Sequence, residues 1–200
     1  PLNISAMRFG PDGHMYFLVG GRNTDSRLYR IKYVGPSQKG AGKRLVANQD
    51  LRDLRHSLEV FHGNPHAGNQ AITMAWPHLS HSDRNVRYAA RLAIENQPVS
   101  LWQERVLREE DQRALIHASI ALCRHGDPSL SHRILKKLNQ IPFDSLAAED
   151  QLALLRAYSL CFIRLGQPAP ALINVVIGNL DPFFPADDEQ VNTELCRVLS

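Results

Sequence analysis

Four of the nine histidines in this 200-residue chain gather between residues 62 and 81, and histidine is the commonest metal ligand among the side chains. A zinc site needs three or four ligands that converge on one point. His62 and His66 are separated by a Gly-Asn-Pro break and so do not share a helix face, and no cysteine lies near His78 or His81. We therefore expect loop or capping roles for these histidines and predict no metal site.

A serine nucleophile is the second chemistry that the residue types allow. His117, Ser119 and Asp127 supply the three members of a Ser/His/Asp set. The chain has neither the strand-turn-helix nucleophile elbow of such enzymes nor a phosphate loop of the form GxGxxG or GxxxxGK[ST]. We predict no catalytic residue in this chain and assign no cofactor-binding residue.

Three arginines at helical spacing form a positive stripe, since Arg84, Arg87 and Arg91 lie three and four residues apart. Such a stripe is suited to receiving an acidic partner or a phosphate. The structural alternative pairs Arg87 with Asp83 or with an aspartate of a neighbouring repeat, and closes an i,i+4 pair between Arg91 and Glu95. We favour the structural roles and keep the three arginines as a candidate partner surface.

A second candidate partner surface is the aromatic turn at Phe183 and Phe184, which precedes an acidic helix start. Asp187, Asp188 and Glu189 favour the positive end of a helix dipole. We expect the two phenylalanines to anchor the turn on the preceding helices, whereas an exposed pair would mark a docking surface.

The tryptophans and cysteines read as packing residues. Trp76 and Trp102 lie within helical apolar stripes, so we expect core packing, with each indole nitrogen bound to a backbone partner. Cys123, Cys161 and Cys196 also lie in apolar helical patterns and are expected to be buried. Their odd number and wide spacing predict no disulfide framework, zinc knuckle or CxxCH haem attachment site.

The bulk composition indicates a globular chain. Its apolar content of 44% is sufficient for a core, and a net charge of +3 with basic residues interspersed among acidic ones argues against nucleic acid as a partner. No segment approaches the roughly 20 apolar residues of a membrane span. The chain begins without methionine and stops inside a helical pattern, so we expect both ends to be cut from a longer protein.

Short alternating segments predict three antiparallel strands in residues 1–35, namely NISAMRF, HMYFLVGG and RLYRIKYVG, with a PDG turn between the first two. Three such strands seldom hold together alone and need a helix layer or the remainder of a larger sheet. Residues 36–50 are rich in glycine and polar residues and are interpreted as a linker.

Residues 51–200 carry helical periodicity. We expect helices near 51–62, 68–79, 84–96, 99–109, 111–125, 129–139, 146–166, 169–180 and 187–199, with short joints that often contain Pro or Gly. Small residues recur on one face of the third helix, after a predicted N-cap at Asp83, and let another helix approach closely: Val86, Ala89, Ala90, Ala93 and Ile94.

Pairing these helices gives a drifting period of roughly 30 to 40 residues, which is typical of helical repeats. The predicted fold is therefore mainly α: an irregular HEAT-like α-solenoid, preceded by a small antiparallel β segment. A compact irregular helical bundle is the alternative.

The order of segments resembles a known arrangement. MRFGPDGHMYFLVGGRNTDSRLYRIKYVG resembles the final β-propeller blade of sugar or sorbosone dehydrogenases that depend on pyrroloquinoline quinone (PQQ). LEVFHG, AWPHLSHSDRNVRYAARLAIENQPVSLW, LLRAYSLCFIRLG and LDPFFPADDEQVNTELCRVL resemble the HEAT-like region of large exported proteins of planctomycete-type bacteria. In that family, propeller and helical repeats are joined and are commonly followed by a c-type cytochrome domain.

This resemblance implies a periplasmic or otherwise exported parent protein that holds PQQ and haem c in other domains, with no cofactor in this segment. The chain is then expected to be a non-catalytic scaffold that binds other domains of the same polypeptide or a protein partner. Two alternatives remain. One is a part of a quinone-dependent dehydrogenase site, with Arg22 or Arg27 near the cofactor. The other is a HEAT-like protein that binds nucleic acid.

Overall fold

The computed structural model describes residues 3–21, 24–35 and 48–200. The chain divides into two compact units, Pro1–Val46 and Ala47–Ser200, a small sheet and a helical unit. Most of the expected linker lies outside the described residues. Gln49 and Asp50 do not belong to it, because they form the first turn of helix α1 (Gln49–Glu59).

The first unit is an antiparallel sheet in the order β1-β2-β3, formed by β1 (Ile4–Phe9), β2 (Met15–Gly21) and β3 (Thr24–Ile31). The predicted PDG turn is confirmed, with Gly13 at a positive φ of 74°. The third strand ends earlier than the alternating pattern predicts. Ile31 pairs with Met15, the first residue of β2, and β3 ends at this pair.

One face of this sheet is apolar and uncovered within the described part of its unit. The strand register places six apolar side chains on it: Met7, Phe9, Met15, Phe17, Tyr29 and Ile31. The Phe17 and Tyr29 rings stack at 5.0 Å, yet Phe9 and Met7 are 73% and 64% exposed. A sheet with such a face gains stability when another layer covers it.

The second unit is helical, and its helices follow the predicted order. After α1 come α2 (Asn69–Ala75), α3 (Arg84–Glu95), α4 (Gln103–Val106), α5 (Gln112–His125), α6 (Ser131–Leu138), α7 (Ala148–Leu165), α8 (Pro170–Leu180) and α9 (Glu189–Leu199). Several predicted helices contain a 3₁₀ turn. Two of these turns carry a proline in their first positions, at residues 76–78 and 128–130.

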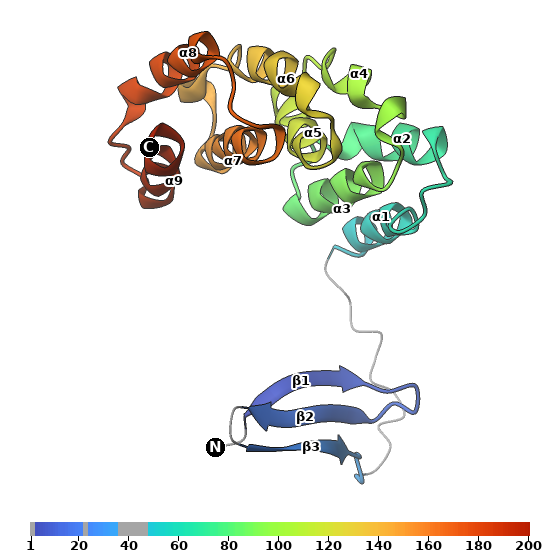
Figure 1. Ribbon diagram of the computed structural model, residues 1–200. Helices are drawn as coiled ribbons and strands as arrows, with labels where there is room; N and C mark the ends of the chain where they lie inside the picture. Colours follow the sequence, from blue (N-terminus) through green and yellow to red (C-terminus); the bar gives the residue numbers. More distant parts are fainter. Residues whose placement is uncertain (1–2, 22–23, 36–47) are drawn as a thin grey trace. The chain divides into compact units, whose positions relative to one another are not determined.

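The helices lie in two rows (Figure 1). In one row, α1 contacts α3, α3 contacts α5, α5 contacts α7, and α7 contacts α9. The even-numbered helices pack beside this row, α2 on α3, α4 on α5, and α6 on α5 and α7. The architecture is mainly helical, with a small antiparallel sheet at the N-terminus.

Helix α3 shows why these segments form helices and stack. The Asp83 side chain accepts hydrogen bonds from the backbone N–H groups of Asn85 and Val86, so it is the N-cap that the sequence predicts. The predicted small-residue face is buried, with Ala90 and Ala93 fully inaccessible. Small side chains bring backbones close, which allows α3 to contact both α1 and α5.

Aspartates begin other helices of the row in the same way. Asp111 accepts from the backbone N–H of Ala114 at the start of α5, and Asp188 caps α9 through Gln190 and Val191.

An ion pair links α5 to α7. The Arg113 guanidinium meets the carboxylate of Asp150 through both oxygens, with Nε–O distances of 2.8 and 3.0 Å. Asp150 is buried, so this bidentate contact sets the spacing of the two helices.

Candidate functional site

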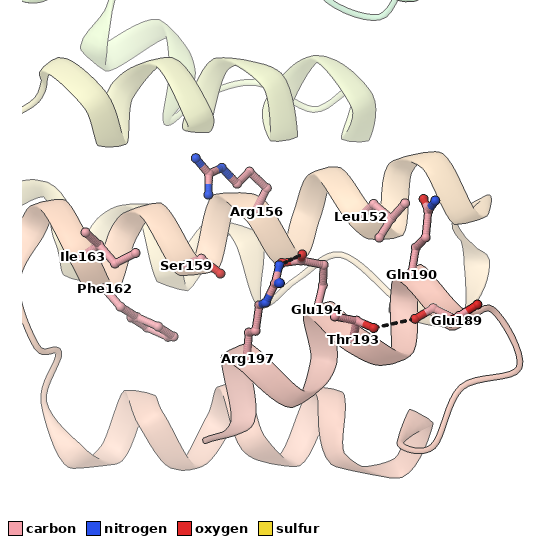
Figure 2. A pocket seen from close by; sticks show the side chains of 10 residues that line it. All are labelled: Leu152, Arg156, Ser159, Phe162, Ile163, Glu189, Gln190, Thr193, Glu194 and Arg197. Atoms are coloured by element: carbon pink, nitrogen blue, oxygen red, sulfur yellow. Dashed lines mark hydrogen bonds and ion pairs between the residues drawn. The ribbon is translucent and has the colours of Figure 1, made fainter. Parts of the chain in front are cut away.

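A groove with a volume of about 770 Å³ lies between α7 and α9 (Figure 2). Charged and apolar side chains line it together: Leu152, Arg156, Ser159, Phe162, Ile163, Glu189, Gln190, Thr193, Glu194 and Arg197. Glu194 and Arg197 form an ion pair on α9. Arg156 extends away from that pair.

A second hollow of about 470 Å³ lies against α3, α5 and α7. Its lining includes all three arginines of the predicted stripe, Arg84, Arg87 and Arg91. The other lining residues are Asn85, Tyr88, His117, Glu149, Leu152 and Ala153. We call this second hollow the recess. Leu152 lines both the groove and the recess, so the two adjoin. We refer to the lining residues of the groove and the recess together as the inner face.

Arg87 is a buried clamp within the recess and not part of a free positive surface. Its side chain is only 3% exposed. Its guanidinium donates to the backbone carbonyls of His81 and Ser82, at 2.7 and 2.8 Å, and pairs with Glu149 of α7. The prediction that Arg87 pairs with an aspartate is therefore wrong. The nearby Asp83 carboxylate caps α3, and the carboxylate that reaches Arg87 belongs to a glutamate two helices along the row.

Arg91 pairs with Glu95 at 3.1 Å, which confirms the predicted i,i+4 contact. The Glu95 side chain is buried and also lies 3.2 Å from Arg124 of α5 and 3.5 Å from the ring of His125. One carboxylate thus holds arginines from two neighbouring helices of the row.

Arg156 of α7 is a third arginine whose charge acts on Arg91. It is exposed and forms no ion pair with any residue the structure describes. Burial lowers the pKa of Arg91, and the positive charges of Arg124 and Arg156 lower it further, whereas Glu95 raises it. The charges of Arg124 and Arg156 therefore both act on Arg91. We call Arg91, Arg124 and Arg156, together with Glu95, the arginine cluster.

His117 lies in the recess as a neutral, largely buried ring. Burial lowers its pKa to about 4, and the charges of Arg87 and Arg91 lower it further. Its Nε2 atom is buried without a hydrogen-bond partner among the described residues. Arg84 is the exposed member of the predicted stripe and forms no ion pair within the same part of the chain.

The two phenylalanines of the aromatic turn differ in their burial and contacts. Phe183 is half-buried and packs on Phe143, with ring centroids 5.2 Å apart, so it anchors the turn as expected. Phe184 is 44% exposed and does not anchor it. The structure does not bring this turn into contact with the arginine cluster.

Two of the four histidines of residues 62–81 use their rings as hydrogen-bonding groups. The His62 ring contacts the Ala89 carbonyl at 2.8 Å, and His81 Nδ1 accepts from the backbone N–H of Asp83 at 2.9 Å. The rings of His78 and His81 lie 6.1 Å apart. Among the residues that the structure describes, no three His, Cys, Asp or Glu side chains meet in a metal-binding geometry.

The Ser/His/Asp combination does not form a nucleophilic site. Ser119 is buried, and its hydroxyl makes no hydrogen bond to any described group, including His117. Asp127 is exposed at the start of a 3₁₀ turn, where it accepts from the backbone N–H of Ser129.

Both tryptophans are buried, as predicted, but only one finds a backbone partner. Trp102 donates to the Gln97 carbonyl at 3.1 Å. Trp76 instead donates to the Glu109 carboxylate at 2.6 Å, and Arg105 lies 4.4 Å above its ring. The expected backbone bond of Trp76 is wrong, because a side chain 33 residues away supplies the acceptor.

Burial is also confirmed for two of the three cysteines. Cys123 and Cys161 lie in the core between α5 and α7, and hydrogen bonding to Cys161 together with burial raises the pKa of the Cys123 thiol. Cys196 is exposed, contrary to the prediction, because α9 buries Val191 and Leu195 and turns Cys196 outward.

Of the two arginines considered for a quinone site, Arg22 lies outside the described residues. Arg27 lies on β3, largely exposed and 4.0 Å from the carboxylate of Asp25.

The arginine cluster is the feature that local sequence reasoning missed. The sequence does contain a signal for it, because Arg91, Arg124 and Arg156 are separated by nearly equal intervals of 33 and 32 residues. They occupy equivalent places on successive helices of the row. The same spacing relates Arg84, His117 and Glu149.

Comparisons with protein-family models, curated proteins and solved structures found no match for this chain. No helix in residues 48–200 combines the length and apolar character that crossing a bilayer requires.

Proposed function

We propose that the helical unit is an irregular HEAT-like α-solenoid that works as a non-catalytic scaffold and protein-interaction module. The observation that carries this proposal is the inner face. Two adjoining hollows of about 770 and 470 Å³ run over four successive helices of one row. Stacked repeats commonly bind partners along such an extended surface.

The contacts between helices support the solenoid arrangement. Each odd-numbered helix packs on the next odd-numbered one, and the period of 32 to 33 residues relates charged positions on α3, α5 and α7. Contacts of this kind between nearest neighbours are the defining property of repeat proteins.

The sheet unit is proposed to be a remnant of a propeller blade. Its uncovered apolar face, with Phe9 and Met7 largely exposed, supports the need for further sheet structure beside it. The resemblance supports the proposal that the chain is part of a large exported redox protein. On this proposal, PQQ and haem c are held by other domains of that protein, and the partners are those domains or another protein.

Site-directed photo-crosslinking in the protein expressed from its natural reading frame tests the interaction role. A benzoylphenylalanine replaces Tyr88, which is 55% exposed on α3 and lines the recess. The matched control replaces Lys136, an exposed residue of α6 outside both hollows. We expect discrete adducts from position 88 and none from position 136. Equal adducts at both positions, or none at either, would contradict the proposal.

The enzymatic alternative has its own test. The purified chain is mixed with PQQ, haem and a panel of sugars, and reduction of an artificial electron acceptor is followed. Sugar-dependent turnover by this chain alone would show that the non-catalytic assignment is wrong.

A further inference from the structure

We infer that the arginine cluster and the adjoining groove form a docking site for an acidic protein segment that also carries apolar side chains. This inference rests on the proposed interaction role and adds the chemistry of the partner.

The arginine cluster carries more positive than negative charge. Arg91, Arg124 and Arg156 place three guanidinium groups on successive helices, and Glu95 pairs with Arg91 and Arg124. The cluster thus holds three positive charges and one carboxylate. Burial is the main cause of the lowered pKa of Arg91, and the charges of Arg124 and Arg156 lower it further, so a bound anion at the cluster would favour the charged guanidinium groups.

Two of the three arginines of the cluster are accessible to a partner. Arg91 is mostly buried, whereas Arg124 is partly exposed and Arg156 lies on the surface. The buried pair of Arg91 and Glu95 holds the partly exposed guanidinium group of Arg124 in place. Guanidinium groups arranged in this way bind carboxylates in bidentate geometry.

The lining of the adjoining groove favours a polypeptide over a nucleic acid. Leu152, Phe162 and Ile163 give the α7 wall an apolar strip beside Arg156. On the opposite α9 wall, Glu189 is acidic and Glu194 is paired with Arg197, so the groove lacks the continuous positive surface that a phosphate backbone requires. A peptide with carboxylates at the cluster and apolar side chains along the strip matches both walls.

Fluorescence anisotropy with defined peptides tests this inference. The probe is a fluorescein-labelled 12-residue peptide of alternating glutamate and leucine, and its counterpart carries glutamine in place of glutamate. We expect the acidic peptide to bind at micromolar concentration, at least tenfold more tightly than the glutamine peptide, with affinity falling as salt is raised.

Matched variants locate the site. Arg156→Gln and Arg124→Gln should each weaken binding of the acidic peptide at least fivefold. Arg108→Gln removes the same charge from an exposed residue after α4, away from both hollows, and should change affinity less than twofold. Circular dichroism confirms that each variant is folded.

The inference is overturned in any of three cases: both peptides bind equally, the acidic peptide fails to bind at 1 mM, or Arg108→Gln weakens binding as much as Arg156→Gln. Tighter binding of a 12-base-pair DNA duplex would assign the site to nucleic acid instead. Should the peptide test fail while position 88 still forms crosslinks, the acidic partner is wrong and the interaction role stands.

Discussion

Replacing Arg87 by methionine tests whether the central residue of the arginine stripe is structural. Methionine keeps the apolar stem of the side chain and removes the guanidinium group. That group donates to the carbonyls of His81 and Ser82 and pairs with Glu149, which connects the loop before α3 to α7.

The expected cost follows from these contacts. A hydrogen bond to a charged group contributes about 1.5 to 3 kcal/mol to stability. Glu149 is 57% exposed and Ser82 lies at the surface, so water replaces part of what is lost. We therefore expect Arg87→Met to lower the free energy of unfolding by about 3 kcal/mol. For a unit of this size, that corresponds to a fall in Tm of roughly 6 to 12 °C.

Urea denaturation followed by circular dichroism at 222 nm measures this change. The matched control is Arg84→Met on the same helix, since Arg84 is exposed and forms no ion pair within the described residues. The control should stay within about 0.5 kcal/mol of the parent chain. Equal stability of the two variants would refute the clamp and return Arg87 to the free positive surface.

Three further predictions concern other parts of the helical unit. The pKa of His117 falls from 6.5 to about 4 on folding, so the unfolded chain binds a proton that the folded chain rejects. Stability should therefore fall by up to about 3 kcal/mol as pH drops from 6.5 to 4, and urea midpoints of His117→Gln should lose this part of the pH dependence. Asp83→Ala removes the cap of α3 and should lower the free energy of unfolding by about 1 kcal/mol in the same assay. An unchanged free energy of unfolding would show that the cap does not stabilise the helix. A maleimide reagent should label only Cys196 in the native protein, and Cys123 and Cys161 only in urea; native labelling of three thiols would contradict the buried positions.

Helix positions were predictable because their signals are local. In α3, one capping aspartate and the spacing of Ala89, Ala90 and Ala93 define both the start of the helix and its buried face. The end of β3 was not predictable in the same way. Its alternating pattern continues to Val34, but the strand stops at Ile31, where the paired strand begins. Pairing between strands depends on residues distant in sequence, which a local pattern does not contain.

In the candidate site, too, the local contacts were predictable and the contacts between helices were not. The pair between Arg91 and Glu95 lies within one turn of helix and was predictable from spacing. The positions of Arg124 and Arg156 relative to Arg91 depend on how α3, α5 and α7 pack, so the only sequence signal for them is the spacing of 32 to 33 residues between these arginines. The burial of Arg87 was missed because helical spacing gives the direction of a side chain and not the carbonyl groups that it meets.

Hydrogen–deuterium exchange on this chain, with and without saturating acidic peptide, tests most directly whether the inner face is the partner-binding surface. We predict slower exchange in residues 84–95, 112–125, 148–165 and 189–199, which form α3, α5, α7 and α9. We predict unchanged exchange in α6 and α8, which lie in the other row (Figure 1). Protection confined to α6 and α8, or none at saturation, would contradict binding at the inner face.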